Sequence, residues 1–184
     1  GGRRLDAGGL AAAPRLRPIR IRAGALGPGA PGRDLLVSPQ HRVLVGGPIA
    51  RRMFGEGELL VPAKHLVGLG GIDVALDVET VEYRHILFDR HEIVFSEGAA
   101  TESFFPGAEA MKTLAAPQRA ELLSLFPELD AAGTPRWGPA RAFAPGARAR
   151  RLAARAERNG QPLGLPIGAL VRGAASGAAA FRSL

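Results

Sequence analysis

The chain has 184 residues, 46% of them hydrophobic, which suits one globular domain, and no apolar run approaches the roughly 20 residues that span a bilayer. It contains no cysteine, which excludes disulfides, thiolate metal sites and a cysteine nucleophile within this chain. The net charge of +7 is divided between Arg-rich ends, residues 1–60 and 131–184, and an acidic centre; this is typical of solvated ends, so no specific nucleic-acid partner is expected.

The predicted elements begin after an irregular start. Residues 1–17 are rich in Gly, Ala, Pro and Arg without periodicity, so they predict an incoming loop. Residues 19–22 alternate apolar and charged side chains, the pattern of a half-buried strand. The runs 34–37 and 42–45, each apolar after a charged first residue, predict two further strands. Pro39 between them predicts a short turn because proline cannot donate to a ladder.

The centre of the chain gives the strongest strand signal. Residues 58–61 predict a strand that leads into one helical turn. Residues 81–88 place alternate side chains on opposite faces of an extended chain. A turn at residues 89–90 then predicts a hairpin whose returning strand is 91–95.

The pattern changes to helix beyond the strands. Good helix formers fill residues 108–125, and Pro117 marks the start of a second helix there. Residues 131–184 predict an Ala-, Arg-, Gly- and Pro-rich tail, partly helical or disordered, with a basic helix at 147–157. We therefore expect one domain over residues 18–130, followed by this tail.

The candidate chemistry centres on histidine, the side chain best placed to move protons near neutral pH. Ser38 and His41 are separated by two residues across the predicted turn, which lets hydroxyl and imidazole approach the same backbone group. The alternative is a turn that the Ser38 hydroxyl stabilises, with a surface histidine. His65 lies among apolar residues and is interpreted as a packing histidine.

His85, Asp89 and His91 share strand parity, so a straight strand would place them on one face as ligands of zinc or another divalent ion. A chain reversal at Asp89 would instead set His85 and His91 across a hairpin. The alternative is a pair of ordinary strand histidines. No CxxC, HExxH, phosphate-loop or GxSxG pattern occurs, and no cofactor is expected.

Three ordered blocks of sequence resemble the bacterial hedgehog/intein-type (Hint) domain family over roughly residues 18–130. The blocks are PIRIRAGALG (18–27), DLLVSPQHRVLV (34–45), and YRHILFDRHEIVFSEG (83–98) with TESF (101–104). The resemblance implies a mainly β, disk-like Hint fold, here with a short C-terminal helical segment.

The resemblance also implies autoprocessing in a single turnover, with the domain's own upstream polypeptide as substrate. An N-terminal Cys or Ser performs an acyl shift in such families, and a later nucleophile resolves the ester or thioester. Ser38-Pro39-Gln40-His41 matches the family's Thr-x-x-His, with Ser in the Thr place. By that match His41 protonates the departing amide nitrogen and Ser38 orients the scissile bond, while His85 and His91 face the centre and assist the second step.

Two departures from the family pattern limit the expected activity. No terminal His-Asn pair closes the domain, so cleavage or ester transfer is expected rather than splicing. Neither Cys nor any Ser or Thr precedes Ser38, so the nucleophile block is expected upstream of Gly1 or has decayed, and the chain alone is expected to be inactive. The alternatives are a non-catalytic binding or structural β module, a basic nucleic-acid-binding protein, and a metal hydrolase using the histidines above.

Overall fold

The computed structural model describes residues 2–107, 111, 114, 116–126, 129, 135, 137–165 and 181–183. The strands are β1 (Gly2–Leu5), β2 (Ile19–Ile21), β3 (Leu35–Val37), β4 (Arg42–Gly46), β5 (Glu58–Pro62), β6 (Ile72–Val74), β7 (Val81–Arg84), β8 (Ile86–Phe88), β9 (Ile93–Ser96), β10 (Ala99–Glu102) and β11 (Phe181–Ser183). The helices are α1 (Ala7–Ala12), α2 (Pro48–Phe54), α4 (Ala116–Leu125) and α5 (Gly146–Arg158), with 3₁₀ turns η1 (Pro14–Leu16) and η2 (Ala63–His65). None of these helices is long and apolar enough to cross a bilayer.

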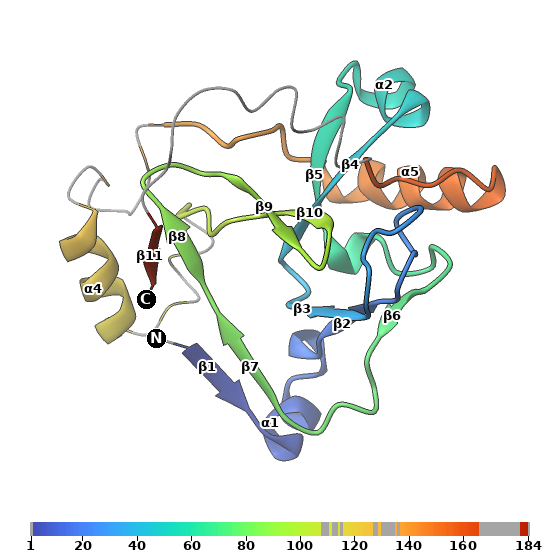
Figure 1. Ribbon diagram of the computed structural model, residues 1–184. Coiled ribbons are helices and arrows are strands. Elements are labelled where there is room, and N and C mark those ends of the chain that lie inside the picture. Colours follow the sequence, from blue (N-terminus) through green and yellow to red (C-terminus); the bar gives the residue numbers. More distant parts are fainter. Residues whose placement is uncertain are drawn as a thin grey trace.

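Antiparallel sheets dominate the fold (Figure 1), as the predicted mainly β class requires. The largest described sheet has the order β5-β4-β10-β9, a second has β3-β2-β6, and the pairs β1-β7 and β8-β11 complete the set. The predicted strands at 19–22, 34–37, 42–45 and 58–61 are confirmed, as is the helical turn that follows the last of them.

Strand β4 is buried on both of its faces. Val43 and Val45 point into the main hydrophobic core, whereas Leu44 points into a second cluster together with Leu60. A strand that is covered on both faces needs a continuous apolar run rather than alternation. Burial on both faces explains why Val43-Leu44-Val45 carries no polar side chain. Arg42, the first residue of the strand, lies at the edge of this buried run.

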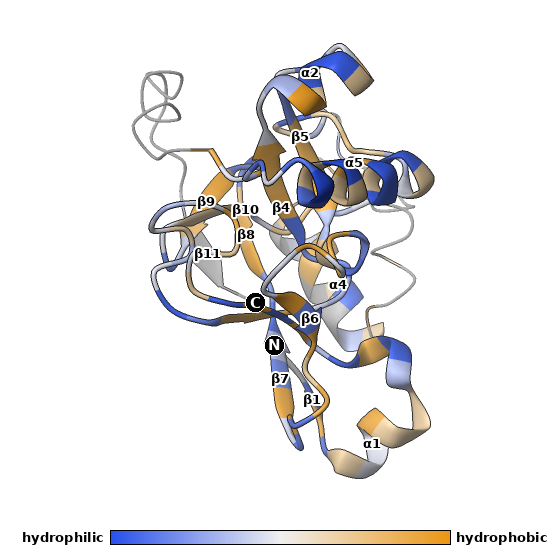
Figure 2. Cartoon of the chain, turned by 90° about the vertical axis from the view of Figure 1, so that its right-hand side faces the viewer, coloured by the Kyte–Doolittle hydropathy of each residue, from blue (hydrophilic) through white to orange (hydrophobic). Residues whose placement is uncertain are grey.

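Helix α5 belongs to the main core, although the sequence places it in a tail. Its buried side chains recur at helical spacing, namely Ala149, Leu152, Ala153 and Ala156. The Arg side chains of this helix are exposed. Figure 2 shows the helix as alternating hydrophilic blue and more apolar tan segments. The C-terminal region therefore completes the core, while the boundary at residue 130 stays a prediction.

The first residues are also ordered, in contrast to the incoming loop expected from their composition. Strand β1 pairs with β7 in register Gly2 to Arg84. Helix α1 follows, and the Asp6 carboxylate caps it by accepting the Gly9 N–H at 2.8 Å. Leu10 on this helix is fully buried. One capping residue and one buried leucine thus order a stretch that lacks periodicity.

The hairpin predicted around residues 89–90 is wrong, because β8 pairs with β11 and β9 pairs with β10. The reversal lies instead at Glu97-Gly98, where both residues have positive φ, 50° and 80°. Two positive φ values match the twist of a two-residue hairpin, so this is where the chain folds back.

Helix α2 was likewise not expected; Pro48 opens it and Gly55, in the left-handed region, ends it.

Helix α4 confirms the predicted helix start near Pro117. The preceding helix predicted from residue 108 lies largely outside the described residues.

Candidate functional site

The turn between β3 and β4 holds the first two candidate residues. The His41 N–H donates to both the carbonyl and the hydroxyl oxygen of Ser38, at 3.0 and 3.2 Å. The Ala63 N–H donates to the His41 carbonyl, and the Lys64 N–H donates to the Pro39 carbonyl. The Ser38 hydroxyl therefore stabilises the turn, which is the local role that the spacing alone also allowed. Because it accepts in this bond, its own O–H stays available as a donor.

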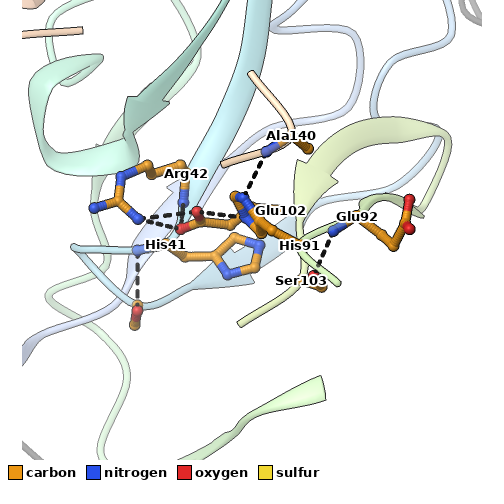
Figure 3. A network of polar contacts seen from close by, with 8 residues as sticks. His41, Arg42, His91, Glu92, Glu102, Ser103 and Ala140 are labelled. Carbon is orange, nitrogen blue, oxygen red and sulfur yellow. Dashed lines mark hydrogen bonds and ion pairs between the residues drawn. The ribbon is translucent and has the colours of Figure 1, made fainter. Parts of the chain in front are cut away.

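The His41 imidazole lies below the Arg42–Glu102 pair (Figure 3). Burial lowers the pKa of His41; the Glu102 carboxylate opposes that effect and Arg42 adds to it. The described residues offer its ring nitrogens no hydrogen-bond partner. His41 is therefore a neutral imidazole near pH 7, with ring nitrogens that are not committed to the fold.

Arg42 and Glu102 form an ion pair that is sheltered from solvent, with side chains 27% and 7% exposed. The Arg42 backbone N–H donates to Oε1 at 2.9 Å, and Nη1 donates to Oε1 and Oε2 at 3.1 and 2.9 Å. The guanidinium carbon also lies 3.9 Å from the centre of the Phe143 ring, a cation–π distance. Backbone, charge and aromatic contacts together fix both partners.

His91 lies on the other side of this carboxylate, with a side chain that is not exposed at all. The Ala140 N–H donates to its Nδ1 at 3.0 Å, so Nδ1 is unprotonated and Nε2 carries the hydrogen. Nε2 lies 3.3 Å from Oε2 of Glu102, within ion-pair distance but poorly aligned for a hydrogen bond. Figure 3 shows His91 between Ala140 and Glu102.

The charge state of Glu102 follows from these neighbours. Burial works to raise the pKa of the carboxyl, but the His91 contact and the Arg42 guanidinium outweigh it, and the pKa lies below its ordinary value. Glu102 is therefore an anion inside the protein at neutral pH, close to two histidines.

The backbone next to His91 aligns it with Glu102. The Glu92 N–H donates to the Ser103 hydroxyl at 2.9 Å, and the Ser103 N–H donates back to the Glu92 carbonyl at 2.9 Å. These two reciprocal hydrogen bonds extend the β9–β10 ladder by one residue pair, Glu92 and Ser103. The extension places His91, the residue before Glu92, beside Glu102.

His85 lies at the junction of β7 and β8, in contact with Phe104, with ring centres 4.5 Å apart and ring planes tilted by 54°. Burial lowers its pKa, and the charge on His41 lowers it further, so the two imidazoles are electrostatic neighbours. The expectation that His85 and His91 face one another across a hairpin is wrong, because their strands do not pair. Among the described residues, which include His85, Asp89 and His91, no group of three ligand side chains gathers around a metal position.

Reasoning from the sequence missed Glu102, Arg42 and Ala140 as parts of this site. Glu102 and Arg42 do lie within the blocks that carry the family resemblance, but nothing local indicated that this glutamate is buried. Ala140 is 49 residues from its partner His91 and carries no signal of its own. His65 lies apart, where its Nδ1 accepts from Arg150 at 3.4 Å.

Comparison with known families identifies the domain type of the first part of the chain. The family model described as Hint domain matches residues 1–108, which include β1, α1 and every candidate residue up to Glu102. It starts earlier than the segment from residue 18 that the sequence blocks indicated, and it ends before Ala140. Searches of curated proteins and of solved structures find no match. Because the match covers more than half of the chain, the protein belongs to the Hint domain family.

Proposed function

We propose that the chain is part of a self-processing Hint domain that cleaves its own upstream peptide bond, with His41 as the proton donor. In this reaction a hydroxyl or thiol upstream of Gly1 attacks the carbonyl before it. The hydroxyl or thiol loses its proton to the neutral His41 imidazole as the C–N bond breaks and an ester or thioester forms. His41 then delivers that proton to the departing nitrogen, which becomes a free amino group. Water or another nucleophile then resolves the ester. The reaction occurs once per chain and needs no cofactor.

The position of His41 is the observation that carries this proposal. The imidazole is sheltered, anchored by its backbone in a turn, and adjacent to an anionic carboxylate. No described residue engages its ring nitrogens, in contrast to the Nδ1 of His91, which accepts a backbone N–H. A histidine that moves a proton needs a free ring nitrogen within hydrogen-bond reach of the reacting atom.

Ser38 contributes through the hydrogen that its turn bond does not use. We propose that the hydroxyl donates it to the carbonyl oxygen of the scissile peptide, which polarises that carbonyl and orients the bond. The loss of the methyl group that a Thr would carry leaves the hydroxyl less restricted in χ1. Ser38 is therefore expected to matter less than His41.

The two remaining histidines take different parts in the second step. His85 is close enough to His41 for their charges to interact, and we propose that it assists the attack on the ester. His91 has one nitrogen on Ala140 and the other against Glu102, so we propose that it acts through that carboxylate.

The 184 residues contain no group that this proposal assigns to the first attack. They contain no Cys, and Ser38 is the first Ser or Thr along the sequence. The 184 residues contain no His-Asn pair, and the proposal therefore covers cleavage or ester transfer and not splicing.

Intact-mass measurement on the protein from its complete reading frame tests the proposal. We expect it to split near the start of the domain, faster with added thiol where a thioester forms, and we expect His41→Ala to stay whole. His65→Ala is the matched control, since His65 is also partly buried but lies apart from Glu102, and it is expected to split normally. A complete protein that stays whole under every condition would favour a non-catalytic scaffold.

A further inference from the structure

We propose that Glu102 is a positioning residue for His41: its buried carboxylate stabilises the protonated imidazole, and Arg42 and His91 hold the carboxylate in place from two sides. The catalytic role of Glu102 rests on the proposed function, in which His41 is the proton donor. The arrangement itself is a property of the 184-residue chain and is measurable without any cleavage.

The carboxylate of Glu102 has little freedom to rotate. Oε1 accepts from the Arg42 backbone N–H and from Nη1, and Oε2 accepts from Nη1 and faces Nε2 of His91. A carboxylate with a backbone donor and a guanidinium on one side and an imidazole on the other keeps both charge and orientation.

The orientation of His91 depends on Ala140. Because Nδ1 accepts the Ala140 N–H, a second hydrogen on Nδ1 would point at that donor. With Nδ1 engaged in this way, the ring carries its hydrogen on Nε2, the atom that faces Glu102 across 3.3 Å. Ala140 thus fixes which edge of His91 is turned toward the carboxylate.

The charges around His41 come from three elements. Figure 3 shows the His41 imidazole next to the Arg42–Glu102 pair, so Glu102 acts on it from β10 and Arg42 from β4. His85 acts on it from the β7–β8 junction. Glu102 is the negative group among them. It opposes both the burial of the imidazole and the Arg42 charge, so without it the protonated form of His41 loses its stabilising partner.

The segment that carries Ala140 lies outside the residues matched to the Hint domain. It is attached to β5 on both sides of Phe143, since the Leu60 N–H donates to the Ala142 carbonyl and the Ala144 N–H donates to the Leu60 carbonyl. Phe143 covers the Arg42 guanidinium. Residues 140–144 therefore serve as a support for the site that the matched domain does not contain.

Nuclear magnetic resonance of the 184-residue chain, with labelled histidine side chains, tests the proposal. We expect Glu102→Gln to shift the His41 titration midpoint to lower pH and Glu102→Asp to restore it in part. Glu97→Gln makes the same charge change in an exposed ion pair and is expected to leave His41 unchanged, while His65 provides an internal reference in every sample. An unchanged or raised His41 midpoint in Glu102→Gln, or an equal shift in Glu97→Gln, would overturn the proposal.

A measurement on the unmutated chain covers the case in which Glu102→Gln does not fold. The imidazole nitrogen shifts of His91 are expected to show hydrogen on Nε2 and none on Nδ1 at pH 7. The opposite tautomer would remove His91 from its role and contradict the arrangement. Neither readout requires cleavage, so a complete protein that stays whole would overturn the proposed function while leaving this inference standing.

Discussion

The two ends of the β9–β10 hairpin each carry a glutamate paired with an arginine, yet the two pairs differ in kind. At the turn, Glu97 binds Arg33 with both side chains open to solvent, 36% and 80% exposed. At the other end, Glu102 and Arg42 are 7% and 27% exposed and are joined by His91. The same pair of residue types serves as surface charge in one place and as a buried support in the other.

Burial explains this difference. An exposed pair exchanges its contacts with water at little cost, so its loss is barely felt. A buried pair has lost its water, and removal of one partner leaves the other charge without compensation. Removal of one partner is therefore expected to cost more stability at the end of the hairpin beside His41 than at the turn.

The largest expected effect is that of Glu102→Ala, which leaves Arg42 and His91 facing an empty, sheltered position. We expect a loss of roughly 3–5 kcal/mol in the free energy of unfolding, measured by urea denaturation at pH 7. A change no larger than that of a surface substitution would show that water reaches the pair and would remove the contrast between the two ends.

A smaller effect is expected from Phe143→Ala, which uncovers the Arg42 guanidinium and the edge of His91. Phe143 is only partly buried, so we expect a loss of roughly 2 kcal/mol rather than the full cost of a core phenylalanine. The same urea experiment measures it. Stability equal to that of the unmutated chain would contradict the support assigned to residues 140–144.

The pH dependence of stability should follow the lowered pKa values at the site. Groups whose pKa is lowered on folding stabilise the protein above their unfolded pKa, and the stabilisation is lost as pH falls. For His41 and His85 the loss begins below the ordinary value of 6.5, and for Glu102 it begins below 4.5. Urea unfolding measured from neutral pH down to well below 4.5 should show the decline, and Glu102→Gln should lack the part below 4.5.

The smallest effect is expected from Glu97→Gln, at the exposed end of the hairpin. Glu97 and Arg33 are open to solvent, so the unfolding curve at pH 7 should coincide with that of the unmutated chain. A clear loss of stability would mean that the surface pair also supports the fold, and the two ends would then differ less than we propose.

The parts of the site that local sequence determines were predictable. Pro39 between two apolar runs predicted the turn that holds Ser38 and His41, because proline interrupts a ladder wherever it occurs. The apolar run of β4 predicted its strand for an equally local reason.

The parts that depend on distant contacts were not predictable in this way. Glu102 is buried because β10 pairs with β4 through Thr101 and Val43, and a single sequence does not show which strands will pair. The hairpin was misplaced for a similar reason. Asp89-Arg90 and Glu97-Gly98 both suit a turn, and only the pairing of β9 with β10 selects the second.

The most direct test of the account is a time course of intact mass at pH 7 for the protein from its complete reading frame, in three forms. The unmutated protein is predicted to split near the start of the domain, Glu102→Gln to split more slowly, and His41→Ala to stay whole. If His41→Ala splits as fast as the unmutated protein, or if all three stay whole, His41 does not act as the proton donor and the account fails.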